Sequence, residues 1–337
     1  MKSNNKLVEV KNLRTYFDTA EGTIKAVDNV NFEINRGETL GVVGESGCGK
    51  SITSLSLMNL VPQPKGYIKS GTINYYAENG VVDITSLNPH SRDMRSMRGN
   101  EMAMIFQEPM TSLNPVYTIG SQIMEAVLLH QDVDKEEARE IAIEMIAKVG
   151  IPAPKQRVDE YPYELSGGMR QRAMIAMALS CNPSFLIADE PTTALDVTIE
   201  AQILDLMQDL QEEFNTAIMF ITHDLDVIGE IADRIMVMYT GKVVETAPVD
   251  DIFYNPKHPY TKGLLASIPK VGRKKRLTPI EGTVPDLNQL PAGCYFAPRC
   301  PQATDKCRKK MPPTFKVDED HSVKCWLAEE EGEESYE

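Results

Sequence analysis

The sequence contains no long hydrophobic segment. Across 337 residues the apolar runs stay short, as in AIMFIT at residues 217–222, whereas about 18 consecutive apolar residues are needed to span a bilayer. The first residues, MKSNNKLVEVKNL, also lack the apolar core and the small-residue cleavage site of a secretory signal. We therefore expect a chain that does not cross a membrane itself and that stays in the cytoplasm.

Positive charge is scarce as well. The chain has 35 Lys and Arg residues against 49 Asp and Glu residues, which gives a formal net charge of −14. Proteins that bind the phosphate backbone usually carry a basic surplus, so a nucleic-acid partner is not expected. The local basic cluster GRKKR at residues 272–276 has the composition of a solvated loop, and the acidic end EEEGEESYE that of a disordered tail.

The cysteines lack the close spacing of a zinc knuckle. Cys294, Cys300, Cys307 and Cys325 follow the pattern C-x5-C-x6-C-x17-C, unlike the C-x2–4-C pairs of structural zinc sites. Disulfides are not expected in a cytosolic chain. Four thiolates suit tetrahedral zinc or a [4Fe–4S] cluster, and reduced free thiols are the third alternative. Metal ligation would help this Pro-rich segment to fold.

Strands and helices are expected to alternate in the middle of the chain. Short apolar runs at residues 184–189, 216–222 and 234–239 are separated by helical patterns at 197–211 and 225–232. This alternation predicts a mostly parallel α/β sheet. The composition, 42% hydrophobic and 25% charged residues, is that of an ordinary globular protein.

The amino-terminal half adds further elements. We expect a half-exposed strand at residues 30–34, a buried strand at 39–44, a helix at 50–60, a hairpin around Gly80, a core strand at 102–107, and amphipathic helices at 119–129 and 135–149. The length favours a core domain with an appended part. We place the core at residues 1–250, a helical insertion at about 108–168, and an extension at 251–337.

A phosphate-binding motif stands between the buried strand and the helix. GESGCGKS at residues 44–51 fits G-x-x-x-x-G-K-[ST], a loop whose backbone N–H groups cradle phosphates. The helix end adds its dipole. The motif predicts ATP and Mg²⁺ as cofactors, with Lys50 on the phosphates and Ser51 on Mg²⁺. The residues expected at the nucleotide are Gly44, Glu45, Ser46, Gly47, Cys48, Gly49, Lys50, Ser51 and Ile52. Cys48 is expected to be alkylatable, and a modified Cys48 would block phosphate entry.

A second strand supplies carboxylates. The apolar run FLIADEP at residues 185–191 ends in Asp189 and Glu190. Asp189 is predicted to hold Mg²⁺, as in phosphoryl-transfer enzymes with this loop, and Glu190 to polarise the attacking water. The alternative is that both carboxylates cap the next turn.

Further motifs resemble one family. LSGGM at residues 165–169 matches the signature sequence of the ATP-binding cassette (ABC) family, and the other motifs follow in that family's order. Gln107 is similar to the Q-loop glutamine, Asp196 in TALD to the D-loop, and His223 to the switch histidine. The resemblance implies a P-loop (RecA-like) α/β core with an antiparallel β subdomain, a helical signature subdomain and a small Cys-rich extension.

Roles follow for these residues. The Gln107 amide could contact Mg²⁺ or water, or merely cap a helix. His223, at a strand end, could donate to a γ-phosphate oxygen, or be structural. Catalytic roles are thus predicted for Glu190, His223 and Gln107, and Mg²⁺ contacts for Ser51, Gln107 and Asp189.

The signature segment is expected at the start of a helix. Ser166, Gly167 and Gly168 would present bare N–H groups to an anion. The resemblance implies that they cap the γ-phosphate of a second cassette, so that the active unit is a dimer. The family also stacks adenine on an aromatic ring near the first strand. Phe17 is the candidate, with Tyr16 as the alternative, although either ring could belong to the core.

The carboxyl-terminal segment indicates a branch of the family. NPKHPYTKGLLASIP at residues 255–269, with GTVPDLNQLPAGCYFAPRCP and HSVKCWL, is similar to the extension of ATPase subunits of oligopeptide and dipeptide importers. This implies ATP-driven peptide import at the cytoplasmic face of the membrane. The implied partners are a second ABC ATPase subunit (a paralogue or another copy), two membrane permease subunits and, indirectly, an external peptide-binding protein.

The resemblance also favours the [4Fe–4S] cluster over zinc for the four cysteines. Two other functions remain open. The chain could power a related importer of nickel or another solute, or it could be a cassette ATPase of translation or DNA repair.

Overall fold

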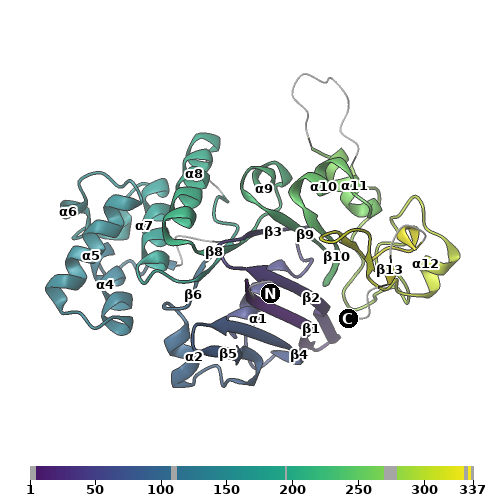
Figure 1. Cartoon of the computed structure of the whole chain (residues 1–337), viewed down its shortest axis with the longest axis horizontal. Coiled ribbons are helices and arrows are strands. Elements are labelled where there is room, and N and C mark those ends of the chain that lie inside the picture. The colour runs from purple at the N-terminus through teal and green to yellow at the C-terminus, as the bar shows by residue number, and fades with distance from the viewer. Residues whose placement is uncertain (1–4, 108–111, 194–195, 269–278, 330–332, 335–337) are drawn as a thin grey trace.

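The chain is built on two β-sheets, which Figure 1 shows one below the other. The computed structural model describes residues 5–107, 112–193, 196–268, 279–329 and 333–334. The smaller sheet has the strand order β2-β1-β4-β5, and the larger sheet the order β13-β11-β12-β10-β9-β3-β8-β7-β6. The strands are β1 (Lys6–Thr19), β2 (Gly22–Asn35), β3 (Thr39–Val43), β4 (Gly66–Ala77), β5 (Gly80–Asp83), β6 (Met102–Ile105), β7 (Phe185–Asp189), β8 (Ala217–Ile221), β9 (Arg234–Tyr239), β10 (Lys242–Pro248), β11 (Phe315–Lys316), β12 (Ser322–Val323) and β13 (Glu333–Glu334).

The centre of the larger sheet is parallel. β9, β3, β8, β7 and β6 pair side by side in the same direction. Every residue of β3, β7 and β8 is buried, which explains why their sequences are continuous apolar runs rather than alternating ones. The predicted α/β fold class is confirmed.

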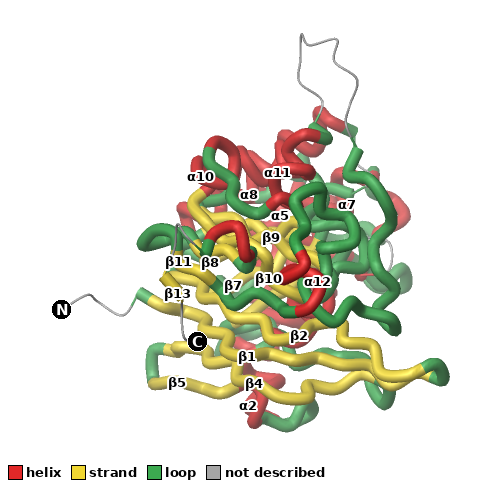
Figure 2. The backbone as a smooth tube through the Cα atoms, turned by 90° about the vertical axis from the view of Figure 1, so that its right-hand side faces the viewer, coloured by secondary structure: helices red, strands yellow, loops and turns green. Residues whose placement is uncertain are grey.

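Helices and the small sheet cover opposite faces of the larger sheet. α8, α9 and α10 lie on one face, and α1 with the small antiparallel sheet on the other (Figures 1 and 2). The helices are α1 (Lys50–Leu57), α2 (Arg92–Met97), α4 (Ile119–His130), α5 (Lys135–Lys148), α6 (Pro154–Arg157), α7 (Gly167–Leu179), α8 (Val197–Phe214), α9 (Leu225–Ile231), α10 (Val249–Tyr254), α11 (Pro259–Ala266) and α12 (Asp305–Lys309). Short 3₁₀ turns are η1 (Ile84–Ser86), η2 (Pro162–Glu164) and η3 (Trp326–Ala328).

Local signals set the helix ends. α5 begins at a capping box, in which the Asp134 side chain accepts from backbone N–H groups and Glu137 reaches back. α8 ends at Asn215, whose φ of 50° is left-handed. The helix predicted at residues 50–60 is shorter, because Asn59 also has a left-handed φ of 50° and cannot continue it.

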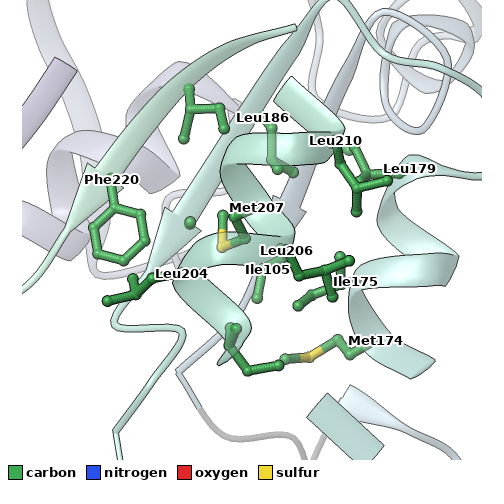
Figure 3. Close-up of a cluster of buried hydrophobic side chains, with 14 of the residues drawn as sticks. Ile105, Met174, Ile175, Leu179, Leu186, Leu204, Leu206, Met207, Leu210 and Phe220 are labelled. Carbon is green, nitrogen blue, oxygen red and sulfur yellow. The ribbon is translucent and has the colours of Figure 1, made fainter. Parts of the chain in front are cut away.

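The amphipathic face of α8 builds the core beneath the helices. Figure 3 shows Leu206, Met207 and Leu210 of this helix against strand residues such as Phe220 and helix α7 residues such as Ile175. Each such side chain stabilises the fold by about 1.5–3 kcal/mol when fully buried. This packing holds α7 and α8 in place next to the strands β6, β7 and β8.

The helical region lies between β6 and β7 in the chain. α4, α5 and α7 contact one another and share the core of α8. The helices predicted at residues 119–129 and 135–149 are confirmed as α4 and α5. The beginning of the predicted insertion, residues 108–111, lies outside the described residues.

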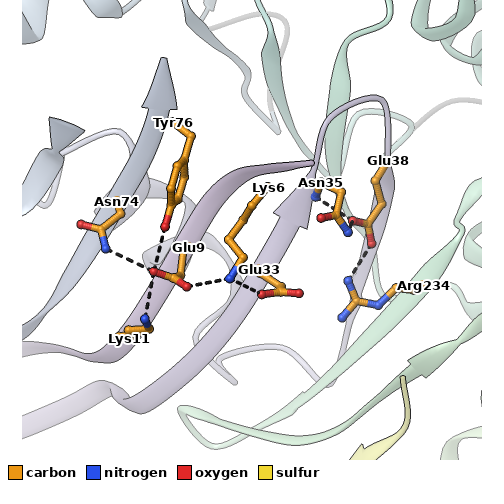
Figure 4. A network of polar contacts seen from close by, with 9 residues as sticks. All are labelled: Lys6, Glu9, Lys11, Glu33, Asn35, Glu38, Asn74, Tyr76 and Arg234. Atoms are coloured by element: carbon orange, nitrogen blue, oxygen red, sulfur yellow. Dashed lines mark hydrogen bonds and ion pairs between the residues drawn. The ribbon is translucent and has the colours of Figure 1, made fainter. Parts of the chain in front are cut away.

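A polar network organises the small sheet (Figure 4). Glu9 pairs with Lys6 at 2.7 Å and with Lys11 at 3.0 Å, and it accepts from Tyr76 at 3.2 Å. Burial opposes the charge of Glu9, but the hydrogen bonds from Lys6 and Lys11 lower its pKa to about 2. This carboxylate therefore stays ionised although it is only 8% exposed.

The extension continues the larger sheet, which the sequence did not predict. β12 pairs with β10 in the register Glu245↔Val323, and β11 pairs with both β12 and β13. Part of the tail that was expected to be disordered thus forms strand β13. The rest of that tail and the basic cluster at residues 272–276 lie outside the described residues.

A buried carboxylate anchors the extension to β10. Glu245 is 0% exposed and accepts from the backbone N–H groups of Lys257 at 2.6 Å and His258 at 3.0 Å, and it contacts His321 Nε2 at 2.9 Å. Burial opposes its charge, yet the hydrogen bond to His321 and these N–H groups lower the pKa of Glu245.

Among the described residues, no helix combines the length and the apolar character required to cross a bilayer.

Candidate functional site

Four segments meet at one edge of the parallel sheet. The phosphate loop follows β3, Gln107 follows β6, Asp189 ends β7 and His223 follows β8. Because parallel strands present their carboxyl ends at the same edge, the topology brings these segments together. The site is thus made by the strand order, and residues more than 100 positions apart in the chain become neighbours.

The phosphate loop contains glycines in left-handed backbone conformations. Gly47 and Gly49 have left-handed φ values of 76° and 102°, and a Cβ on Gly49 would collide with the carbonyl oxygen of Ala26. Lys50 Nζ donates to the Gly44 carbonyl at 2.7 Å and to the Glu45 carbonyl at 3.4 Å. The ammonium group therefore lies over the loop, where a phosphate would compete for it.

The loop residues fall into exposed and buried groups. Ser46, Gly47 and Ser51 are exposed, while Gly44, Cys48 and Lys50 are buried. Ile52, in the first turn of α1, packs against the core between the two sheets.

Two of the three residues predicted at Mg²⁺, Ser51 and Asp189, are in direct contact, whereas Gln107 bonds to Glu190. Ser51 Oγ donates to Asp189 Oδ1 at 3.1 Å. Asp189 is 5% exposed; burial raises its pKa, as does the neighbouring Glu190 charge, whereas Ser51 and Lys50 oppose the rise. Ser51 and Asp189 thus offer two adjacent oxygen ligands, and the carboxylate of Asp189 is buried without a cation that balances its charge. Both properties fit the ligand preference of Mg²⁺.

Glu190 is the centre of a polar cluster. Its backbone φ of 49° is left-handed, and its N–H donates to the Ile221 carbonyl at 2.9 Å. Its Oε2 accepts from Gln107 Nε2 at 3.0 Å and lies 3.5 Å from His223 Nδ1. The structure therefore brings Gln107 and His223, two of the three predicted catalytic residues, to one carboxylate oxygen of the third, Glu190.

Thr193 also joins this cluster, which sequence reasoning missed. Its Oγ1 donates to Glu190 Oε2 at 3.0 Å. Its position three residues after Glu190, in the turn that follows β7, is the signal that could have found it.

The signature segment opens α7 as predicted. Ser166 is the N-cap, and its Oγ accepts from Met169 N at 3.3 Å. α7 contacts β6 at the edge of the sheet, whereas the phosphate loop follows β3, with β8 and β7 between them. Gln171, a buried residue to which no role was given, donates from its amide to the Pro191 carbonyl and so ties α7 to the end of β7.

Asp196 caps helix α8. Its Oδ1 accepts from Ile199 N at 3.0 Å. The preceding D-loop residues, 194–195, lie outside the described residues.

The two aromatic candidates for adenine point to different surroundings. Tyr16 OH donates to Asp28 Oδ1 at 3.2 Å, and Asp28 is also paired with Lys242 at 2.9 Å. The half-buried Phe17 ring lies against Gly66 of the neighbouring strand, where no Cβ would fit. The hydroxyl of Tyr16 thus has a partner in the protein, and the Phe17 ring packs against the backbone of the neighbouring strand.

The expectation of an alkylatable Cys48 is contradicted. This thiol is 2% exposed, and burial raises its pKa. Both effects lower the accessible thiolate on which alkylation depends.

The four cysteines of the extension line a single small cavity. Cys294, Cys300, Cys307 and Cys325 share it with His258 and other side chains, and Cys294 N donates to the Cys307 carbonyl at 2.8 Å. Burial raises the pKa of Cys325 to about 12, and the other three thiols add to the rise. Across the described residues, however, no three His, Cys, Asp or Glu side chains are placed to ligate one metal ion.

The geometry defines a P-loop nucleotide-binding site of the ATPase kind, and comparisons with known proteins agree. A family model described as "ABC transporter" matches residues 27–193, and one described as "Oligopeptide/dipeptide transporter, C-terminal region" matches residues 244–307. The oligopeptide transport ATP-binding protein AppD of Bacillus subtilis is 55% identical over 97% of this chain and 98% of its own. The dipeptide transport ATP-binding protein DppD of the same organism is 47% identical over 97% and 96%.

Solved structures show the same fold. The cassette MJ0796, in a dimeric post-hydrolysis state bound to ADP and Pi, has a TM-score of 0.63 at 27% identity and covers 72% of this chain and 99% of its own. The chain belongs to the ABC transporter family, in the branch of the oligopeptide and dipeptide transport ATP-binding proteins. It is an ATPase.

The buried charge of Asp189 gives a first prediction. Asp189→Asn should raise the melting temperature in Mg²⁺-free buffer at pH 7 by about 2–4 °C, because the amide keeps a partner for Ser51 without a buried charge. Hydrolysis of MgATP should fall about 100-fold or more. Since the folded pKa lies above the unfolded value of 3.8, the gain in stability should appear as the pH rises above that value and be complete above the folded pKa.

The matched control is Asp205→Asn, on the exposed face of α8. Thermal melts of both variants, with and without Mg²⁺, check the prediction. Equal melting temperatures for the two variants without Mg²⁺ would contradict it.

Proposed function

We propose that the chain is the ATP-hydrolysing subunit of an importer of dipeptides or oligopeptides. The observation that carries this proposal is the combination, in one chain, of the site at the sheet edge with an extension that matches the oligopeptide/dipeptide transporter C-terminal region. The full-length relatives named as peptide transport proteins support the same substrate class.

The proposed catalysis is mainly positioning and electrostatics. Backbone N–H groups of the phosphate loop other than that of Glu45, which donates to Tyr260, and the Lys50 ammonium would hold the phosphates, with Ser51, Asp189 and Gln107 holding Mg²⁺. Bound Mg²⁺ would neutralise charge on the phosphates. Glu190 would orient the attacking water, and His223 would donate to the γ-phosphate.

The cluster around Glu190 supports these roles. Gln107 and His223 already lie beside this carboxylate. The left-handed backbone of Glu190 is a strained conformation of the kind found at functional sites.

We propose that two cassettes form the working unit. Ser166, Gly167 and Gly168, at the start of α7, would cap the nucleotide of the partner cassette, with Asp196 close to the contact. In the larger sheet, strands β8 and β7 separate β3, which precedes the phosphate loop, from β6, which α7 contacts. This separation from the phosphate loop of the same chain supports the arrangement. The partner would be a paralogue or a second copy.

Docking to membrane permeases is proposed for the surface near Gln107 and the helical insertion. Val116 and Tyr117 lie between Gln107 and α4 and are 71% and 57% exposed, and Leu129 is 72% exposed. Adjacent exposed apolar side chains such as Val116 and Tyr117 are a feature of interaction surfaces. Through such contacts the chain would bind peripherally at the cytoplasmic face of the membrane, and an external binding protein would deliver the peptide to the permeases.

The proposed domain division follows the matches. The cassette would comprise residues 1–250, with the helical subdomain at about 108–168 inserted, and the extension residues 251–337. The matched regions, 27–193 and 244–307, support this division.

The four cysteines are proposed to hold a [4Fe–4S] cluster, with zinc as the alternative. Their convergence on one cavity supports this. Thiolate ligands suit either group, although ligation would require the side chains to move, since no three potential ligands among the described residues are placed to hold one metal ion.

The colour of the purified protein tests whether a cluster is present. Protein purified without oxygen should be brown and absorb at about 400 nm, as clusters with thiolate ligands do. The variant Cys300→Ser should lose this absorbance. The control Cys181→Ser, away from the cavity, should keep it. A colourless protein with one equivalent of zinc would contradict the cluster and leave the zinc site.

A variant of Glu190 tests the ATPase role and transport together. In a reconstituted complex with permeases, binding protein and peptide, Glu190→Gln should bind ATP and hold a closed dimer. Turnover should fall about 100-fold or more, since the amide cannot polarise water as the carboxylate does. Peptide uptake should stop.

Hydrolysis, dimer formation and uptake are measured separately in that experiment. Near-normal turnover of Glu190→Gln would remove Glu190 as the base. Wild-type ATPase that responds to another solute but to no peptide would overturn the peptide part of the proposal.

A further inference from the structure

We propose that the C-terminal extension presets the phosphate loop for nucleotide binding, with Arg299 and Tyr260 as the positioning residues. The inference rests on the phosphate-binding role of residues 44–51. It concerns a link between two parts of the chain that carry separate sequence motifs and lie more than 200 residues apart.

The link is centred on Glu45, the second residue of the loop. Arg299 Nη1 lies 2.6 Å from Glu45 Oε2, and Nη2 lies 3.0 Å from Oε1. A two-point pair of this kind fixes both the distance and the orientation of the carboxylate. The backbone N–H of Glu45 donates to Tyr260 OH at 2.9 Å. The extension therefore holds both the side chain and the backbone of this residue.

The residues that hold Glu45 are themselves tightly packed. The Arg299 side chain is 4% exposed, and Tyr260 is 0% exposed. The Arg299 guanidinium lies 5.8 Å from the Tyr239 ring centroid and 6.0 Å from that of Phe296. These rings also pack on each other, with Tyr239 4.7 Å from Tyr260 and 5.3 Å from Phe296. Arg299 thus has little freedom to leave Glu45.

The aromatic group shares Phe296 with the cysteine cavity. Phe296 lines the cavity, and its ring centroid lies 6.0 Å from the Arg299 guanidinium. Arg299 N also donates to the Phe296 carbonyl at 2.9 Å, in a turn between Cys294 and Cys300. Folding of the cysteine segment therefore places the arginine.

Two physical effects follow for a bound nucleotide. First, a loop already held in one conformation loses less entropy when the nucleotide binds. If a smaller fraction of the molecules held the loop in the binding-competent conformation, the apparent affinity for the nucleotide would fall in proportion. Second, Glu45 is an anion inside a loop that must accept polyphosphate. Arg299 neutralises it, and without Arg299 the carboxylate would repel the ligand.

The two effects make a distinctive prediction for paired variants. Arg299→Met should weaken ATP binding by the full-length chain about tenfold, as expected if the competent loop fraction falls to about a tenth. Glu45→Gln in the same chain should recover part of that loss, because it removes the charge that Arg299 had neutralised. Arg299→Lys should lie between Arg299→Met and the wild type, since it keeps the charge but not the two-point geometry.

A milder variant covers the case in which Arg299→Met folds poorly. Tyr260→Phe removes only the hydroxyl that accepts from Glu45 N–H. It should weaken ATP binding about threefold and speed hydrogen exchange of the Glu45 amide, with the fold unchanged.

The measurement is equilibrium binding of a fluorescent ATP analogue, together with hydrogen exchange of residues 44–49. Lys309→Met is the matched control, because it removes one exposed positive charge from the same extension. Lys50→Ala tests the loop itself. If Lys50→Ala binds like the wild type, the phosphate-binding role fails.

If Lys50→Ala loses binding while Arg299→Met and Tyr260→Phe match Lys309→Met, only the positioning role is overturned. Additive losses in Glu45→Gln/Arg299→Met would overturn it as well. If Arg299 and Tyr260 only attach the extension to the cassette, their variants should lower the melting temperature and leave the affinity for the analogue unchanged, which would also overturn the positioning role.

Discussion

The functional site is positioned by the parallel pairing of β3, β8, β7 and β6. It aligns the ends of these strands, and backbone hydrogen bonds continue the alignment into the functional segments. Thr222 N donates to the Val42 carbonyl at 3.2 Å, and Glu190 N to the Ile221 carbonyl at 2.9 Å. The side chains that follow are therefore placed by the sheet and not by flexible loops, which is what electrostatic catalysis requires.

Two features of the site are unfavourable for folding, and the stability of the sheet compensates for them. Asp189 is a carboxylate buried at a strand end, and Glu190 has a left-handed backbone. Both conditions oppose folding in isolation, and both place a carboxylate where an Mg²⁺-bound nucleotide would need it. The apolar packing of α7 and α8 on the strands stabilises the sheet against these costs (Figure 3).

Much of this arrangement could be predicted from short patterns. The continuous apolar runs predicted β3, β7, β8 and β9, and the glycines and Lys50 of the loop predicted its phosphate-binding backbone, because these properties depend on neighbouring residues. The burial of Cys48 was not predicted, because exposure depends on segments remote in the chain, such as β9, whose Met238 belongs to the same core cluster as Cys48. The strands of the extension were missed because two-residue strands such as β11 and β12 have no periodicity of their own.

Local motifs were sufficient to identify the class of protein and the chemistry available at each motif, since a phosphate loop and a strand-end carboxylate are local features. The tertiary arrangement was needed to show which side chains meet. It placed Gln107 and His223 on Glu190, gathered the four cysteines on one cavity, and set Arg299 and Tyr260 against Glu45. Such contacts depend on strand order and on packing between remote segments, and no local pattern records them.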